Sequence, residues 1–402
     1  MKFRTILYAL TALFAASCGL SEIGEGTDDG YVNGGIWGGP LQDSQTGKLD
    51  QVCYMTVVDY QKDYDWRADQ AKETVKCSLV VYADGRPLMK VPVGEAYQIS
   101  ADPDMHRIID GHLYTDYSTD SLTIIKKDGI LLHTYPGREL ICGMHLLEDG
   151  LYSLGQNRDG TGFTFRRDAE VLVSRKTGTV MGTLRNVEGS LAFAFYDTIH
   201  SSEGDICRYY IVTDGKVSQV AVRDDLKVVW DILACGSEPL YLASLTGVAA
   251  PVLFSGDRMM TLPLPSNAIL LSASLFYESD MICAEILYSV GKDIYTYIWS
   301  GGSIVCTFPK GMTAAAVYPL DRGVCSVANP LSAEGSAIIY RSGDQYSAPQ
   351  GYACLGSDAV SMVNGILHVG LSSTEGDRPL LWKDAQTDTL NVNGYISSVT
   401  AF

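Results

Sequence analysis

Ten cysteines and six histidines are the side chains of this chain that could hold a metal or attack a substrate, so their spacing is the first question. The cysteines stand at positions 18, 53, 77, 142, 207, 235, 283, 306, 325 and 354. Zinc sites use close pairs of cysteine or histidine, and no such pair occurs here. Most cysteines lie inside apolar runs, which predicts buried thiols. Cys53 and Cys77 flank a long polar stretch and are the best candidates for a disulfide.

The histidines have no repeated spacing, although His112 and His368 occupy equivalent positions in two copies of a repeat. Such residues could bind a metal or act as a general base, but a polar group at a strand end is the favoured interpretation. The loop 156–162 resembles a calcium loop in composition only, because Gly155 and Arg166 fall where carboxylate ligands are needed. It is predicted to be a hairpin loop. We therefore expect no catalytic residue set, no metal site and no cofactor.

One polar stretch has the composition of a recognition loop. It holds Tyr60, Asp63, Tyr64, Asp65 and Trp66 and is longer than the equivalent stretches elsewhere in the chain. The aromatic rings offer flat faces to a sugar or a peptide, and the carboxylates can accept hydrogen bonds. The alternative is that these rings pack on their own sheet.

The N-terminus carries an export signal. Lys2 and Arg4 precede an apolar run of about 11 residues, which is too short to remain as a membrane-spanning helix. Small residues then lead to Cys18. We expect residues 1–17 to be a cleaved signal peptide. One interpretation is an ordinary signal peptide cut near Ser17, with Cys18 a free thiol. The other is that Cys18 is modified with lipid.

Ala15-Ala16-Ser17-Cys18 resembles the bacterial lipobox, in which small residues precede a cysteine that is lipid-modified and becomes the mature N-terminus. The resemblance implies attachment to a membrane through Cys18. Residues 18–49 are rich in glycine and acids and are predicted to be a flexible tether. The acids just after Cys18 are also similar to a signal that sends some outer-membrane lipoproteins to the cell exterior. The expected location is the outer membrane, on the periplasmic or the cell-surface side.

Composition excludes one class of partner and indicates the fold. Lys and Arg number 30 against 47 Asp and Glu, a net charge of −17, which disfavours nucleic acid. With 40 glycines, 24 tyrosines and 19% charged residues, the chain is suited to short strands joined by tight turns.

A turn recurs along residues 50–402. Its markers are Asp84, Asp128, Asp168, Asp214, Gly256, Gly301, Gly343 and Asp384, spaced by about 43 residues. A unit of this length with about four strands has the size of one β-propeller blade. The fold class predicted is all-β, an eight-bladed β-propeller, with seven blades as the alternative.

A second landmark keeps step with the first, as in Gly111-His112-Leu113-Tyr114 and Gly150-Leu151-Tyr152. After the eighth turn the segment Tyr395–Phe402 reads as a strand with no hairpin partner. The first unit, from Val52 on, lacks an innermost strand. We therefore expect the C-terminal strand to pair into the first blade and close the propeller there.

The eighth unit, Leu381-Trp382-Lys383-Asp384, is similar to a Trp-Lys-Asp/Asn-Gly turn pattern of poorly characterised secreted bacterial β-propeller lipoproteins. The resemblance implies the fold and the location, and no activity. The function expected is a membrane-anchored propeller that serves as a binding or assembly scaffold for a glycan or a protein. The alternative is a cell-surface enzyme that acts on a polysaccharide or a peptide.

Overall fold

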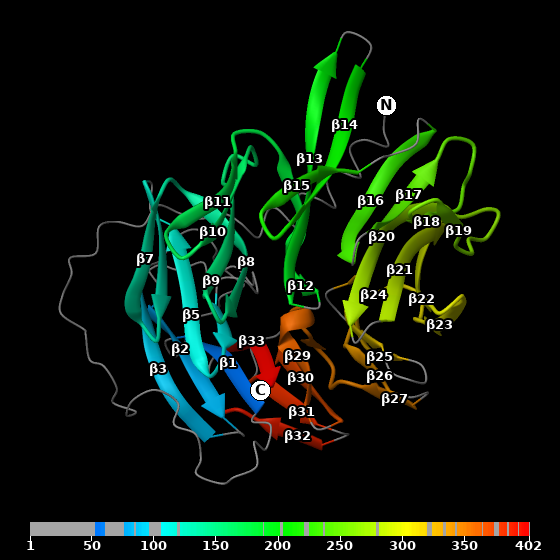
Figure 1. The fold of residues 1–402 in the computed structure, drawn as a ribbon. Coiled ribbons are helices and arrows are strands. Elements are labelled where there is room, and N and C mark those ends of the chain that lie inside the picture. Colours follow the sequence, from blue (N-terminus) through cyan, green and yellow to red (C-terminus); the bar gives the residue numbers. More distant parts are fainter. Residues whose placement is uncertain are drawn as a thin grey trace. The chain divides into compact units, whose positions relative to one another are not determined.

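The computed structural model describes residues 53–60, 76–83, 86–95, 106–118, 121–187, 189–201, 204–220, 225–235, 238–278, 281–319, 324–332, 335–341, 344–363, 365–373, 378–383, 386–392 and 394–401. They form two compact units. The first holds the described residues up to Pro136 and from Asp358 onward, and the second holds those within Gly137–Ser357. Each unit is built from antiparallel sheets, most of them four-stranded, which we call blades and number along the chain (Figure 1).

The first unit contains blades 1, 2 and 8. Blade 1 combines β1 (Cys53–Tyr60), β2 (Lys76–Ala83) and β3 (Arg86–Glu95) with the C-terminal strand β33 (Gly394–Ala401). Blade 2 consists of β4 (His106–Ile109), β5 (His112–Ser118), β6 (Leu122–Lys127) and β7 (Ile130–Pro136). Blade 8 contains β29 (Val360–Val363), β30 (Ile366–Ser373), β31 (Leu380–Lys383) and β32 (Gln386–Thr389).

The second unit contains blades 3 to 7. Blade 3 is β8 (Glu139–Leu147), β9 (Gly150–Asn157), β10 (Phe163–Arg167) and β11 (Glu170–Arg175); blade 4 is β12 (Thr179–Val187), β13 (Ser190–Ser201), β14 (Gly204–Thr213) and β15 (Lys216–Gln219). Blade 5 is β16 (Leu226–Cys235), β17 (Glu238–Leu245), β18 (Val252–Ser255) and β19 (Arg258–Thr261); blade 6 is β20 (Ile269–Glu278), β21 (Met281–Val290), β22 (Asp293–Ser300) and β23 (Ser303–Thr307). Blade 7 is β24 (Met312–Pro319), β25 (Val324–Pro330), β26 (Ile338–Arg341) and β27 (Asp344–Ser347). The short strand β28 (Tyr352–Ala353) follows, and the 3-10 turn η3 (Ser357–Ala359) comes where the chain passes from the second unit to the first.

The eight turn markers all fall between the third and fourth strands of their sheets. Asp128 follows β6, Asp168 follows β10 and Asp214 follows β14, for example. Because each of the eight markers corresponds to one sheet, the repeat count of eight is confirmed and the alternative of seven is wrong. The fold is an all-β propeller of eight antiparallel blades.

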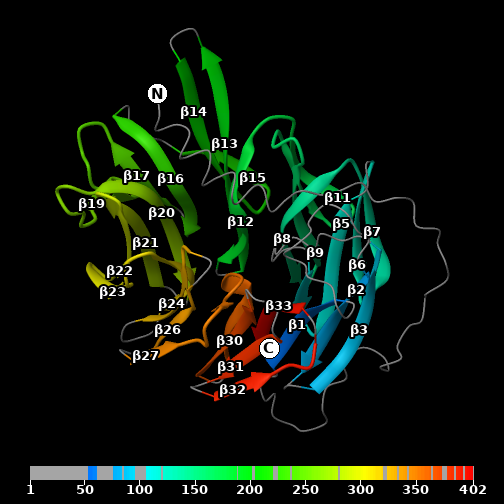
Figure 2. The same ribbon diagram turned by 180° about the vertical axis from the view of Figure 1, so that it is seen from behind.

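The C-terminal strand β33 lies beside β1 in blade 1, as predicted from its lack of a hairpin partner in the sequence (Figure 2). β33 pairs antiparallel with β1, with Met55 opposite Val399 and Val57 opposite Ile396. Ile396 and Val399 are buried in a cluster that also includes Leu381 of blade 8. The strand therefore completes blade 1 and contributes to the core that blade 1 shares with blade 8.

Within each unit, apolar cores lie between neighbouring blades, because alternate residues of each strand point to opposite faces of its sheet. Phe163 and Phe165 of blade 3 pack on Phe193 and Phe195 of blade 4. The Phe163 ring lies 4.7 Å from that of Phe195 and 5.3 Å from that of Phe193. The sheets thus carry apolar side chains on both faces, and the polar groups among them need specific partners.

Candidate functional site

The residues expected to anchor the chain and bind a ligand lie mostly outside the described residues. This applies to Cys18 and to the loop residues Asp63, Tyr64, Asp65 and Trp66. Tyr60 is the last residue of β1, and its backbone lies opposite Cys77 of β2. The loop therefore leaves blade 1 at the β1–β2 hairpin.

Strand register excludes the candidate disulfide between Cys53 and Cys77. Cys77 lies opposite Tyr60 at one end of the hairpin, whereas Cys53 begins β1 at the other end and lies opposite Ala401. Seven strand residues separate them, which corresponds to roughly 20 Å, while bridged cysteines have Cα atoms within about 7 Å. The sequence placed both residues next to the loop but could not give the register. Six described cysteines are present as thiols rather than as a disulfide, and three of them are buried: Cys142, Cys207, Cys283, Cys306, Cys325 and Cys354.

Each of the two equivalent histidines has a partner close to its own strand. The Nδ1 atom of His112 lies 2.7 Å from Oδ2 of the turn residue Asp128. His368 is buried, and its Nδ1 lies 3.1 Å from the carbonyl oxygen of Ile366. These contacts hold strand ends and turns. Within the part of the chain that the structure describes, no group of three or more His, Cys, Asp or Glu side chains could hold a metal ion.

The 156–162 loop is a hairpin loop, as predicted. The amide of Asn157 donates to the carbonyl of Gly162 at 3.0 Å, and that of Gly160 donates to Asn157 at 2.9 Å. The Asp159 carboxylate accepts from the amide of Thr161 at 2.9 Å. Amides of the loop therefore donate to the carbonyls of Asn157 and Gly162 and to the Asp159 carboxylate, oxygens of the kind that bind calcium.

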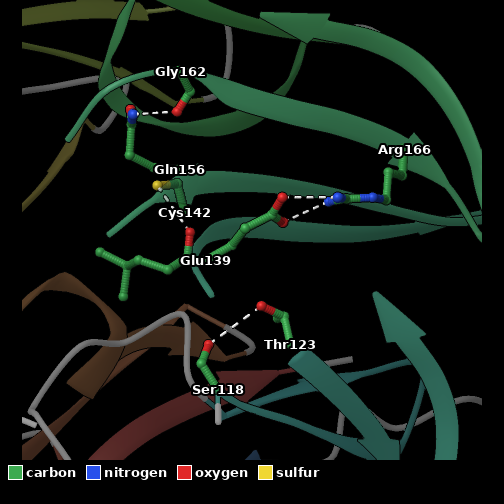
Figure 3. A network of polar contacts seen from close by, with 8 residues as sticks. Ser118, Thr123, Glu139, Cys142, Gln156, Gly162 and Arg166 are labelled. Atoms are coloured by element: carbon green, nitrogen blue, oxygen red, sulfur yellow. Dashed lines mark hydrogen bonds and ion pairs between the residues drawn. The ribbon is translucent and has the colours of Figure 1, made fainter. Parts of the chain in front are cut away.

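Blade 3 contains a buried ion pair that the sequence did not reveal (Figure 3). The guanidinium of Arg166 donates from both terminal nitrogens to the two oxygens of Glu139, at 2.6 and 2.8 Å. The two side chains are 5% and 4% exposed. A methyl group on Gly155 would overlap the Glu139 carboxylate, so glycine is required beside the pair. A bidentate pair of this kind fixes the alignment of β8 against β10.

A set of polar side chains joins the first strand of one blade to the blade before it. The side-chain oxygen of Gln156 in blade 3 accepts from the amide of Val180 in blade 4 at 2.6 Å, and the same side chain donates to the carbonyl of Gly162 at 2.5 Å. In the first unit, the hydroxyl of Ser372 in blade 8 accepts from the amide of Ile396 in blade 1 at 3.2 Å. The first strand of a blade has one free edge, and these contacts satisfy its amides.

Two carboxylates of the second unit, Asp231 and Glu285, belong to this set. Asp231 of blade 5 accepts from the amide of Leu275 in blade 6 at 2.7 Å and from its neighbour Ile232 at 2.8 Å. Oε1 of Glu285 in blade 6 accepts from the amide of Ala314 at 2.9 Å and the hydroxyl of Thr313 at 3.0 Å, both in blade 7. These acids bind backbone across blade boundaries.

Burial raises the pKa of both carboxyls above their ordinary values, because it disfavours the charged form. The hydrogen bonds from Leu275 and Ile232, and the charge of Arg185, lower the pKa of Asp231 in opposition to burial. Perturbed acids often mark catalytic sites. Here each one is already engaged by the neighbouring blade. A single acid between apolar residues, as in Ala284-Glu285-Ile286, was the signal in the sequence that could have identified them.

Comparison with known proteins supports the fold alone. No family model matches the chain, and no curated protein matches it. A solved dihydro-heme d1 dehydrogenase, NirN, in complex with DHE matches 87% of this chain and 74% of its own, with a TM-score of 0.51 and 11% identity. The β-propeller domain of the Trilobed protease from Pyrococcus furiosus matches 75% of this chain and 92% of its own, with a TM-score of 0.43 and 12% identity. In the described residues no helix is long and apolar enough to span a membrane. At such identities the similarity concerns the architecture, and this chain is an eight-bladed β-propeller by its own sheets.

Proposed function

We propose that the chain is an exported lipoprotein whose propeller serves as a binding or assembly scaffold at a membrane surface. Residues 1–17 are removed, Cys18 carries the lipid, and residues 18–49 form the tether. The lipobox resemblance of Ala15-Ala16-Ser17-Cys18 supports the anchor. A single acyl chain binds membranes only weakly, so stable attachment requires the several chains of a bacterial lipoprotein.

The scaffold role is supported chiefly by one observation: the acids Asp231 and Glu285 accept hydrogen bonds from the backbone of the next blade. Burial raises the pKa of Asp231 and of Glu285, a shift that is also common among catalytic acids. Their oxygens accept hydrogen bonds from the next blade, so their protonation state is linked to blade packing. The loop around Tyr64 and Trp66 is the proposed recognition element, because long polar loops on rigid sheets commonly carry binding residues.

The anchor is tested by a Cys18→Ser variant of the whole chain. We expect palmitate label on the wild-type protein in the membrane fraction, and an unlabelled, folded variant released from that fraction. Circular dichroism and thermal unfolding of the released protein check that the propeller is intact. Membrane retention of the variant with its lipid label unchanged would contradict the proposal.

The recognition element is tested separately. Replacing Tyr64 and Trp66 by alanine is expected to abolish binding of the anchored protein to its ligand while the thermal midpoint stays the same. Unchanged binding of this variant to every oligosaccharide or peptide that binds the wild type would remove the loop from the proposal. The anchor would still rest on the Cys18 result.

A further inference from the structure

Blade 6 carries a row of apolar side chains across three of its strands. Tyr288 of β21 lies opposite Tyr295 of β22 on one side and opposite Leu270 of β20 on the other. Directly opposed residues of antiparallel strands point to the same face of the sheet. The two tyrosine rings lie 5.7 Å apart with an angle of 24° between their planes. Leu270, Tyr288 and Tyr295 are all partly exposed, so this face continues to the surface.

The row rests on a rigid base. Tyr297 is two residues beyond Tyr295 and therefore points to the same face, but it is buried. Its hydroxyl donates to the carbonyl of Pro263 at 2.5 Å, and its ring lies 6.1 Å from the ring of Tyr288. Tyr288 also packs against the apolar cluster between blades 5 and 6. The rings are therefore held from beneath before any ligand arrives, which reduces the entropy lost on binding.

A polar pair lies beside the row. Asp293 is two residues before Tyr295, on the same face of β22, and its carboxylate lies 2.7 Å from the ammonium of Lys310. The backbone next to Lys310 is held to β22, because the amide of Gly311 donates to Ile294 at 2.8 Å. The pair offers both donors and acceptors and has no net charge.

The phenol groups add further donors. Burial, together with the nearby Tyr295, raises the pKa of the Tyr288 hydroxyl above its ordinary value. The group therefore stays protonated at neutral pH. The row thus combines flat apolar surface with uncharged hydroxyls and a neutral ion pair at its rim.

We infer that Tyr288 and Tyr295, with Asp293 and Lys310 at their rim, form a binding platform for a neutral sugar chain. A sugar ring has a face of C–H groups, which packs on an aromatic ring, and an edge of hydroxyls, which exchange hydrogen bonds with carboxylate, ammonium and phenol groups. A negatively charged sugar would be repelled by the Asp293 carboxylate and would compete with it for Lys310. The inference deepens the proposed binding role and rests on it, and it places a ligand site in blade 6.

The test uses the whole mature chain in detergent. Isothermal titration calorimetry is carried out with cellohexaose, xylohexaose and maltohexaose, and with hexagalacturonic acid as the charged comparison. We expect at least one neutral oligosaccharide to bind and the acidic one to bind more weakly. Tyr295→Ala and Tyr288→Ala are each expected to weaken binding by about tenfold or more, the effect of losing one stacked ring.

Matched controls come from blade 4. Tyr196 and Tyr209 form a second pair of opposed tyrosines, with rings 6.2 Å apart and tilted by 43°. A Tyr196→Ala variant should bind as the wild type does. Thermal unfolding of each variant separates lost binding from lost folding, and Asp293→Ala weakens binding without removing a ring that packs on the core.

The outcomes are distinct. Weaker binding in the Tyr295→Ala and Asp293→Ala variants, with wild-type binding by Tyr196→Ala, supports the platform, and this holds whether or not the Tyr64/Trp66 loop also contributes to binding. Binding lost only in the loop variant overturns the platform and supports the recognition loop. If none of the three neutral oligosaccharides binds the wild type, the platform is overturned, while the lipoprotein proposal still depends on Cys18.

Discussion

Asp168 and Leu151 hold each other through two hydrogen bonds, one in each direction. The amide of Asp168 donates to the carbonyl of Leu151 at 2.7 Å, and the amide of Leu151 donates to Oδ1 of Asp168 at 3.1 Å. Asp128 with Leu113 and Asp214 with Leu191 repeat the same contact in blades 2 and 4. The turn marker and the second landmark therefore recur together, because a residue of the marker forms hydrogen bonds with a residue of the landmark.

In blade 6 the contact between the turn and the second strand is made by another residue. Its marker is Gly301, which has no side chain to offer, and the preceding Ser300 donates from its hydroxyl to the carbonyl of Ile282 at 2.8 Å. Ile282 is the second residue of its strand, as Leu151 is in blade 3. The link between turn and second strand is thus kept where the aspartate is absent.

The first prediction concerns Asp168. Its φ is +49°, in the left-handed region that asparagine and aspartate tolerate better than alanine. Asp168→Ala loses the carboxylate bond to Leu151 and is strained, so we expect it to lower the free energy of unfolding by about 1–3 kcal/mol. Urea unfolding measures the change. Asp168→Asn is the matched control and should lose far less. Equal losses for alanine and asparagine would show that the turn contact is unimportant.

The second prediction concerns the buried pair in blade 3. Removing one partner, as in Arg166→Met, leaves the Glu139 charge buried and is expected to lower the free energy of unfolding by about 3–5 kcal/mol. The double variant Glu139→Leu/Arg166→Met removes both charges and should recover much of that loss. Denaturant unfolding of the two single variants and the double variant gives the coupling energy. Additive losses would show that the two side chains do not depend on each other.

The third prediction compares the two buried carboxyls. Both hydrogen bonds of Glu285 to blade 7 reach the same oxygen, Oε1, so the amide oxygen of Glu285→Gln can accept both. The two oxygens of Asp231 accept from two different amides. Asp231→Asn therefore sets an NH₂ group against a backbone amide, and we expect it to lower the free energy of unfolding by about 1–3 kcal/mol. Glu285→Gln should be neutral or stabilising at pH 7.

The same carboxyl of Glu285 sets a pH dependence. Its pKa is raised in the folded chain, so the folded state binds a proton at pH values where the unfolded state, with an ordinary pKa of about 4, has lost it. Its contribution to stability therefore falls as pH rises from about 4 through the raised folded value. Urea midpoints measured from pH 4 to pH 8 should fall less steeply for Glu285→Gln than for the wild type. Parallel curves for the two proteins would contradict this assignment.

The fourth prediction concerns the C-terminal strand. Tyr395, Ile396 and Val399 are 2%, 0% and 3% exposed. Deleting residues 395–402 removes the edge partner of β1 and this buried surface, so we expect aggregation or a much lower thermal midpoint. Ile396→Ala alone should lower the free energy of unfolding by about 2–5 kcal/mol. Thr389→Ala on the exposed strand β32 is the control. An unchanged midpoint after truncation would show that β33 is peripheral.

Much of the fold could be read from the sequence because its signals are local. A positive φ at Asp128, Asp168 and Asp214 is a property of a turn and its own residue, and Gly256 and Gly301 repeat it at the equivalent turns of blades 5 and 6. The strand after the eighth turn could also be identified from local signals, because a count of the strands in each repeat leaves this segment without a hairpin partner. These local signals therefore predicted the number of blades and the position of β33.

The candidate site depended on contacts between distant residues. Asp231 and Leu275 are 44 positions apart, and nothing near Asp231 in the sequence indicates which amide it binds. The positions of Cys53 and Cys77 on opposite ends of a hairpin, and of Tyr288 opposite Tyr295, likewise follow from strand register. The sequence determined the repeating unit, because turn conformation is local. The tertiary structure decided which polar groups meet, because burial and hydrogen bonding depend on the blade packed alongside.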